Sequence, residues 1–160
     1  MHMQVSDQKD TTPIADLSAA WSQVAAFASA MDASLSKWLM DAHRIGPTDY
    51  RALAHLSQAS DKELRVNDLA QRIGLNQSSA TRLVSRLEAK DLTFRDTCPD
   101  DGRGVYAVIT EQGETLLREV RGAYEERVRG LLGNMGAHHP ELDAHQVTRA
   151  LRDISNLVSR

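Results

Sequence analysis

The sequence predicts a mainly α-helical protein that carries a single small β-hairpin, with long helices at both ends of the chain. Three observations support this class. Apolar residues recur at steps of three and four over most of the chain, which is the period of amphipathic helices. Alanine and leucine are abundant while aromatic residues make up only 4%, which favours helices over sheets. Only residues 95–110 depart from this pattern, because they combine β-branched residues with a turn rich in Asp and Gly.

Composition and charge indicate a globular protein. A length of 160 residues suits one domain with a core, and a charged fraction of 26% is typical of soluble proteins. The single cysteine cannot form an internal disulfide. Residues 1–13 lack the apolar core of a signal peptide, and the longest uncharged run, residues 17–31, is too short to span a bilayer. We therefore expect a cytoplasmic protein.

The N-terminal part is expected to form a flexible tail, residues 1–12, followed by a long helix. Pro13 suits a first helical turn, and Gly46-Pro47 ends the helical pattern. Between them lies one apolar ridge, formed by Ile14, Leu17, Trp21, Val24, Phe27, Met31, Leu35 and Trp38. A helix of that length extends beyond a small domain and needs a surface to pack against.

The central region, residues 46–110, is expected to contain three short helices and the hairpin. Apolar residues between 50 and 56 mark the first of these helices, and residues 57–65 (SQASDKELR) are interpreted as a polar connection. Asn67 is predicted to cap the second helix and Asn76 the third, because asparagine is a favoured N-cap residue.

Residues 69–87 (LAQRIGLNQSSATRLVSRL) have the spacing of a helix-turn-helix. Ala70 is small where two helices approach closely, and Gly74 permits the left-handed turn that ends the first helix. Leu75 is expected to anchor the turn in the core. The second helix is predicted to bury one apolar face, formed by Ala80, Leu83, Val84 and Leu87.

The opposite face of that second helix is polar and basic. Residues 76–90 hold Arg82, Arg86 and Lys90 against Glu88, a net charge of +2 in a chain whose net charge is −3. Short hydroxyl side chains let a helix approach a DNA major groove, and arginines reach base edges or phosphates. We expect DNA contacts from Gln77, Ser78, Ser79, Thr81, Arg82, Ser85 and Arg86. An ordinary solvated helix with arginines is the alternative at this point.

The hairpin that follows directly is interpreted as a wing. Residues 93–97 and 105–109 are strand-like and flank a turn rich in Asp and Gly. Arg103 at the tip is predicted to enter the minor groove, with Asp101 holding its side chain. Arg95 at the base is predicted to contact a phosphate.

Residues 13–45 and 111–160 are expected to form a helical dimerisation region. Thr110 is predicted to cap a long helix, and a last helix follows an interruption at residues 133–140. The ridges of these two helices are Leu117, Val120, Tyr124, Val128 and Leu131, then Val147, Leu151, Ile154 and Leu157. Together with the first helix they expose more apolar surface than one small centre can cover, so we expect a homodimer. An intramolecular helical bundle is the alternative.

Residues 68–117 closely resemble the winged helix-turn-helix of MarR-family transcriptional regulators. The matching features are Leu69-Ala70, residues 80–84 (ATRLV), Leu87-Glu88, Arg95, Asp101-Gly102-Arg103, and Ile109-Thr110 followed by Gly113. Residues 46–56 (GPTDYRALAHL) resemble the family's second helix, and the terminal helices resemble its dimerisation elements. Two positions depart from the family pattern. Asp91 stands where a glycine usually follows the recognition helix, and Gly102 replaces the first of two wing arginines.

The resemblance implies a ligand-responsive regulator, usually a repressor, that binds double-stranded DNA as a homodimer at a pseudo-palindromic operator. It also implies a pocket for a small aromatic or phenolic effector between the dimerisation helices and the DNA-binding lobe. The residues expected there are Trp38, His43, Arg44, Tyr50, Arg51 and His55. An aromatic ring beside cations suits an aromatic carboxylate. The alternative is that Trp38 belongs to the core and that the cations are surface residues.

Other functions have weaker support in the sequence. Cys98 lies among aspartates that suppress its thiolate, which disfavours a redox sensor. A zinc-responsive regulator would use the cluster His138, His139, Glu141, Asp143 and His145, whose spacing matches no compact zinc signature. No pairing of nucleophile and base and no phosphate-binding loop is present, so we expect neither an enzyme nor a cofactor. A helical dimeric protein-interaction module without DNA binding remains an alternative.

Overall fold

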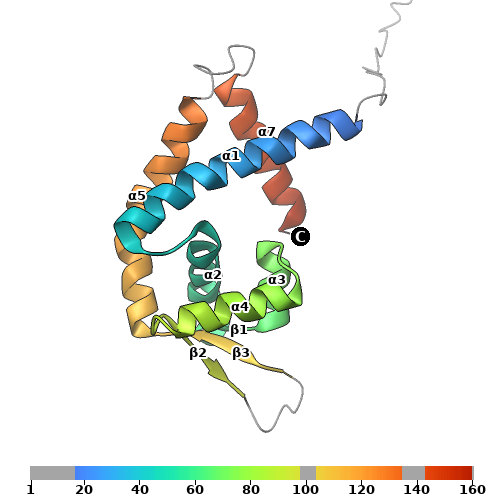
Figure 1. Cartoon of the computed structure of the whole chain (residues 1–160). Coiled ribbons are helices and arrows are strands. Elements are labelled where there is room, and N and C mark those ends of the chain that lie inside the picture. The colour runs from blue at the N-terminus through green and yellow to red at the C-terminus, as the bar shows by residue number, and fades with distance from the viewer. Residues whose placement is uncertain (1–16, 98–103, 135–142, 160) are drawn as a thin grey trace, which may run out of the picture.

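The computed structural model describes residues 17–97, 104–134 and 143–159. In chain order its elements are α1 (Leu17–His43), α2 (Pro47–Gln58), η2 (Ser60–Lys62), β1 (Glu63–Arg65), α3 (Val66–Ile73), α4 (Gln77–Glu88), β2 (Thr93–Asp96), β3 (Tyr106–Ile109), α5 (Glu111–Gly133) and α7 (Ala144–Val158). A compact lobe of α2, α3, α4 and the strands lies at one end of the molecule, and α1, α5 and α7 extend away from it (Figure 1). The predicted class, mainly α with a small hairpin between long terminal helices, is confirmed.

The core fills the lobe and the adjoining parts of α1 and α5. Its buried side chains come from α2, α3, α4, β2 and β3 together with α1 and α5, and include Leu39, Leu53, Leu56, Leu69, Leu83, Leu87 and Leu117. The predicted buried face of α4, Ala80, Leu83, Val84 and Leu87, is at most 1% exposed. Each fully buried leucine stabilises the fold by about 1.5–3 kcal/mol relative to an exposed one.

The junction of α1 and α2 is a sharp corner. Arg44 follows α1 in the left-handed conformation, with φ 59°, and Ile45 beside it is only 1% exposed. Pro47 then occupies the first turn of α2, where its missing N–H costs no hydrogen bond. The Asp49 carboxylate accepts a hydrogen bond from the Gly46 backbone N–H at 2.9 Å, which fixes the start of the helix.

The helix-turn-helix has the predicted turn but a different start. Gly74 follows α3 with φ 70°, the left-handed conformation that glycine adopts without strain. Asn76 caps α4 as predicted, because its side-chain oxygen accepts from the Ser79 backbone N–H at 2.8 Å. The prediction of Asn67 as a cap is wrong. The N-cap of α3 is Arg65, because strand pairing extends to the Val66 N–H, which donates to the Val105 carbonyl at 3.0 Å.

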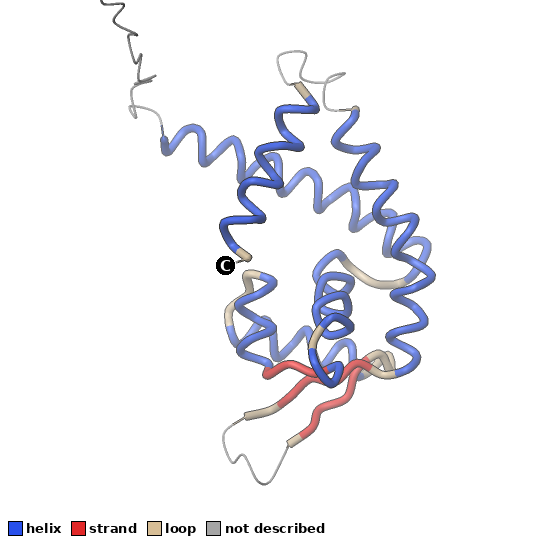
Figure 2. The backbone as a smooth tube through the Cα atoms, turned by 180° about the vertical axis from the view of Figure 1, so that it is seen from behind, coloured by secondary structure: helices blue, strands red, loops and turns tan. Residues whose placement is uncertain are grey.

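The sheet has three antiparallel strands in the order β1-β3-β2, and it lies at the end of the lobe away from α1 (Figure 2). β2 and β3 are the predicted hairpin, with Thr93 opposite Ile109 and Asp96 opposite Tyr106. The interpretation of residues 57–65 as a polar connection is wrong for residues 63–65. They form β1, which pairs with β3 from Glu63 opposite Val108 to Arg65 opposite Tyr106. A three-residue edge strand is too short to give a periodic signal.

Asp91 joins α4 to β2 in the left-handed conformation, with φ 59°, at the position where the family usually has glycine. The Thr110 hydroxyl donates to the Asp91 carbonyl at 2.6 Å and accepts from the Gly113 N–H at 3.0 Å. Thr110 therefore caps α5 as predicted and also holds the turn that contains Asp91.

The terminal helices carry large apolar side chains that the described part of the chain leaves exposed. On α1 these are Leu17, Trp21, Val24 and Met40, and on α7 they are Leu151, Ile154, Leu157 and Val158. None of the residues of α7 is buried. Residues 1–16 and 135–142, which include the predicted tail and Pro13, lie outside the described residues. Among the described helices, none is sufficiently long and apolar to cross a membrane.

Candidate nucleic-acid interface

Helix α4 has one face buried in the lobe and one face exposed. Six of the seven helix residues predicted to contact DNA are exposed: Gln77, Ser78, Thr81, Arg82, Ser85 and Arg86. Ser79 is partly buried, and its backbone N–H donates to the side-chain oxygen of the Asn76 cap. The helix lies beside the sheet, at the end of the molecule opposite the C-terminal end of α5 (Figure 1).

The exposed face of α4 is shallow and polar. Gln77, Ser78, Thr81 and Arg82 line a shallow surface depression. The Thr81 hydroxyl donates to the Gln77 carbonyl at 2.9 Å, and the Ser85 hydroxyl donates to the Thr81 carbonyl at 3.0 Å. The Thr81 hydroxyl oxygen can still accept a hydrogen bond from an amino group that a base presents in the major groove, whereas the Ser85 hydroxyl already accepts one from Arg95.

Arg95 connects the base of the hairpin to α4. Its guanidinium forms an ion pair with Glu88 at 3.2 Å and a hydrogen bond with the Ser85 hydroxyl, and its backbone N–H donates to Glu88 at 3.1 Å. The side chain is still 34% exposed. Arg95 also lines a cavity of about 300 Å³ between α3, α4 and the hairpin, together with Arg65, Gln77 and Thr81. Arg95 therefore has a structural role in holding the hairpin against α4, and the phosphate contact predicted from the sequence would be a second role.

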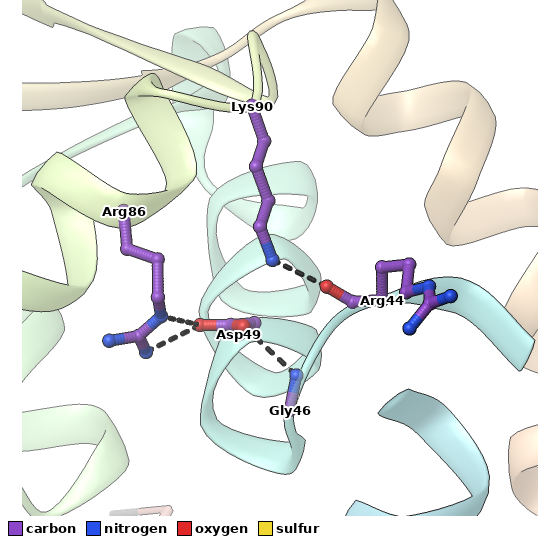
Figure 3. A network of polar contacts seen from close by, with 5 residues as sticks. All are labelled: Arg44, Gly46, Asp49, Arg86 and Lys90. Carbon is purple, nitrogen blue, oxygen red and sulfur yellow. Dashed lines mark hydrogen bonds and ion pairs between the residues drawn. The ribbon is translucent and has the colours of Figure 1, made fainter. Parts of the chain in front are cut away.

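Arg86 has a buried partner. Its guanidinium contacts the Asp49 carboxylate through Nη2 at 2.7 Å and Nε at 3.2 Å (Figure 3). The Asp49 side chain is 3% exposed, whereas that of Arg86 is 48% exposed. Sequence reasoning missed Asp49, although an acidic residue in the first turn of a helix that starts Gly-Pro is a usable signal.

The wing can be followed only at its base. The described residues end at Thr97 and resume at Gly104, so the predictions for Asp101 and Arg103 lie outside them, as does Cys98. Within the described part of the chain, no group of three or more His, Cys, Asp or Glu side chains could hold a metal ion. Of the proposed zinc cluster, Asp143 caps α7 by accepting from the His145 N–H at 2.9 Å, and His138, His139 and Glu141 lie outside the described residues.

Of the six residues predicted to bind an effector, Trp38 and His43 lie at the C-terminal end of α1. Trp38 lines a cavity of about 490 Å³ with residues of α5, and its ring contacts His43 edge-on at 5.7 Å between centroids. The cavity is also lined by the α5 residues Ala123, Glu126, Arg127, Gly130 and Leu131, and by Asn134, which follows the helix. No local pattern marks these residues as lining a cavity, because the α5 face that packs beside Trp38 depends on the tertiary arrangement.

The other four lie elsewhere. Tyr50 stacks on Tyr124 with 3.8 Å between ring centroids, and burial raises the pKa of both phenols. Arg51 forms an ion pair with Asp32 of α1, with Nη1 at 3.1 Å from Oδ2. Arg44 forms the corner after α1. Burial, together with the nearby Arg72, lowers the pKa of His55.

A helix-turn-helix whose second helix exposes a polar, basic face, followed by a hairpin, defines a winged-helix DNA-binding protein. Comparison with known proteins agrees. Residues 45–104 match the model of the MarR family. The chain is 27% identical over 107 residues, 67% of its length, to the HTH-type transcriptional regulator MhqR of Bacillus subtilis (strain 168), covering 72% of that protein.

Solved structures show the same fold. Sco3205, a MarR family transcriptional regulator from Streptomyces coelicolor solved in complex with DNA, aligns with a TM-score of 0.73 and 24% identity over 91% of this chain and 86% of that one. The transcriptional regulator BldR from Sulfolobus solfataricus aligns with a TM-score of 0.72 and 24% identity over 93% and 99% of the two chains. Residues 45–104 therefore match the MarR family, the chain as a whole has the fold of MarR-family proteins, and it is a DNA-binding transcriptional regulator.

Proposed function

We propose that this regulator acts in the cytoplasm as a homodimeric, effector-responsive repressor of a pseudo-palindromic operator. The observation that carries the proposal is the exposed face of α4, whose short polar side chains surround Arg82 while the opposite face is locked in the core. We propose no catalytic activity and no bound cofactor.

In the proposed complex, α4 enters the major groove and Arg82 contacts base edges, supported by Gln77, Ser78, Thr81 and Ser85. Arginine binds the O6 and N7 atoms of guanine with two hydrogen bonds, which discriminates against the wrong base by about 1–3 kcal/mol. Arg103 of the wing would reach the adjacent minor groove, with Asp101 holding it. Two such lobes, related by a two-fold axis, would place the recognition helices about 34 Å apart, one turn of DNA.

In the proposed domain organisation, residues 46–110 bind DNA, and residues 13–45 and 111–160 form the dimer interface. The exposed large apolar residues of α1 and α7 support this assignment, because apolar side chains that gather on exposed helices favour an interface with another chain. A second copy of the chain would cover both helices.

The proposed effector is a small aromatic carboxylate or phenol that occupies the cavity between Trp38 and α5. Trp38 offers a ring for stacking and Arg127 offers a cation for a carboxylate. The cavity lies at the junction of the proposed dimerisation helices, so a ligand there would alter how α5 packs beside α1. Thermal-shift measurements with a set of phenolic acids test this, and no stabilised complex with any of them would contradict it.

A gel shift on the region upstream of the chain's own gene tests the operator proposal. We expect a retarded band that persists in the presence of about a hundredfold excess of random DNA. Specific DNA-binding proteins bind their sites about 10³-fold or more tightly than random DNA, so this excess should not displace the operator. Binding of every duplex with equal affinity would contradict a defined operator. No binding to any promoter would favour the helical protein-interaction module instead.

A further inference from the structure

The C-terminal end of α4 is tied to the corner between α1 and α2 by two polar contacts. One is the ion pair of Arg86 with Asp49, and the other is a hydrogen bond from the Lys90 ammonium to the carbonyl of Arg44 (Figure 3). Both acceptors lie within the short segment that links α1 to α2 and begins α2. The last turn of the recognition helix is therefore fixed at a point that the long helix α1 also fixes.

Asp49 is the centre of this arrangement. It is one of the two polar or charged residues among those described as buried, with a residue exposure of 2%. One carboxylate oxygen accepts from the Gly46 N–H at 2.9 Å, and the other accepts from two nitrogens of Arg86. A carboxylate held on both oxygens cannot move without breaking the start of α2.

This geometry restricts what Arg86 does on DNA. If the guanidinium turned toward a phosphate, it would leave the buried Asp49 carboxylate without its cation, which is strongly unfavourable. Arg82, one turn earlier on α4, has no such partner among the contacts within the described residues, and it is exposed beside Gln77, Ser78 and Thr81. Arg86 is therefore held by an ion pair with a buried carboxylate, whereas Arg82 is exposed on the polar face of the same helix.

We propose that Arg86 and Asp49 are positioning residues for DNA recognition: their ion pair sets the orientation of α4 relative to α1, and Arg86 does not contact DNA. The proposal rests on the operator binding proposed above. It assigns the base contacts to the N-terminal and middle turns of α4, and it makes the corner 44–49 the link that orients α4 relative to the dimerisation helix.

The test compares Asp49→Asn, Arg86→Gln and the double variant on a duplex selected from random DNA with the wild-type protein. The asparagine keeps an oxygen for the Gly46 N–H but removes the charge that holds Arg86. Binding is measured by fluorescence anisotropy at several salt concentrations, for the selected duplex and for a scrambled one. Asp32→Asn is the matched control, because it breaks an ion pair between α1 and α2 that does not involve α4.

If the pair positions α4, each single variant loses about tenfold in affinity for the selected duplex, comparable to the loss of one base contact. The scrambled duplex is affected less, the double variant is no weaker than the singles, and the slope of log affinity against log salt is unchanged. The control binds like the wild type.

If Arg86 instead contacts a phosphate, Arg86→Gln weakens both duplexes equally and reduces the salt slope by about 0.9. Asp49→Asn then adds its own separate effect, and the proposal is overturned. Should Asp49→Asn prove too unstable to bind, Arg86→Gln alone decides, because the salt slope and the discrimination ratio separate the two roles. A wild-type protein that selects no duplex would refute the operator proposal itself, independently of these variants.

Discussion

Three arginines in and beside α4 have different contacts. Arg82 is exposed on the polar face of α4, Arg86 is paired with the buried Asp49, and Arg95 holds the hairpin against Glu88. Their positions on the sequence suggested DNA contact for all three, because charge and helical face were the only information. The distinction comes from partners that lie 37 residues away for Arg86 and 7 for Arg95.

Replacing Arg82 with alanine is expected to reduce discrimination between operator and random DNA by about 1–3 kcal/mol, because the guanidinium supplies base contacts. Fluorescence anisotropy on both duplexes measures it. Arg129→Ala, on an exposed arginine in the last turns of α5, is the matched control and should change neither affinity. Equal losses on both duplexes would reduce Arg82 to a phosphate contact.

His55 is expected to make the fold less stable as pH falls. Its pKa in the folded state lies below the ordinary value of 6.5, because burial and Arg72 disfavour the charged form. The unfolded chain therefore binds the proton more readily than the folded one. The contribution of neutral His55 to the free energy of unfolding is fully present above about pH 6.5 and is lost as pH falls through the pKa of the folded state.

Urea unfolding of the wild type and of His55→Gln at about pH 8 and about pH 5.5 tests this linkage. The wild type should lose more stability than the variant between the two values. Parallel losses in both proteins would show that His55 does not contribute.

At the scale of single elements, caps and close approaches decide where helices start and how they meet. Asn76 and Thr110 cap α4 and α5 as their types predict, whereas Asn67 does not cap α3. Asn67 does not cap α3 because of a tertiary contact: β1 pairs with β3 as far as Arg65, so α3 begins directly after the strand, at Val66. Gly113 marks a second tertiary constraint, in the first turn of α5.

Gly113→Ala is expected to destabilise the fold by about 1–3 kcal/mol, the usual cost of overpacking. A Cβ at this position would lie 2.3 Å from the Leu92 carbonyl oxygen and 2.7 Å from Ile109 Cγ1. Gly122→Ala is the control in the same helix, because nothing lies within 4 Å of its Cβ position. That change should stabilise the helix by roughly 0.5–1 kcal/mol. Urea unfolding of both variants checks the pair, and equal effects would contradict the close approach.

At the scale of the whole molecule, a well-packed lobe adjoins terminal helices that pack poorly. The lobe buries the large leucines almost completely, while Ile154 is 56% exposed and Leu157 is 72% exposed on α7. α5 belongs to both parts, since its first half lies in the core and its C-terminal end lies near the start of α7 (Figure 1).

Ile154→Asp is expected to shift the protein from dimer to monomer, because it places a charge in the apolar face that a second copy would cover. Asn156→Asp is the control. It adds the same charge to the same helix on the side away from the apolar ridge, and it should leave the dimer intact. Light scattering after size-exclusion chromatography measures both masses. A wild-type protein that is monomeric at all concentrations would contradict the proposed dimer.

The sequence by itself determined the order of helices, the helix-turn-helix with its turn at Gly74, the hairpin and the polar face of α4. These features depend on periodicity and on residues with strong local preferences, so they can be read without knowing what packs against them. Only the tertiary structure decided the edge strand at Glu63–Arg65, the start of α3, the pairing of Arg86 with Asp49 and the cavity between Trp38 and α5. Each of these depends on contacts between segments far apart in the chain, and such contacts leave no periodic or local signal in one sequence.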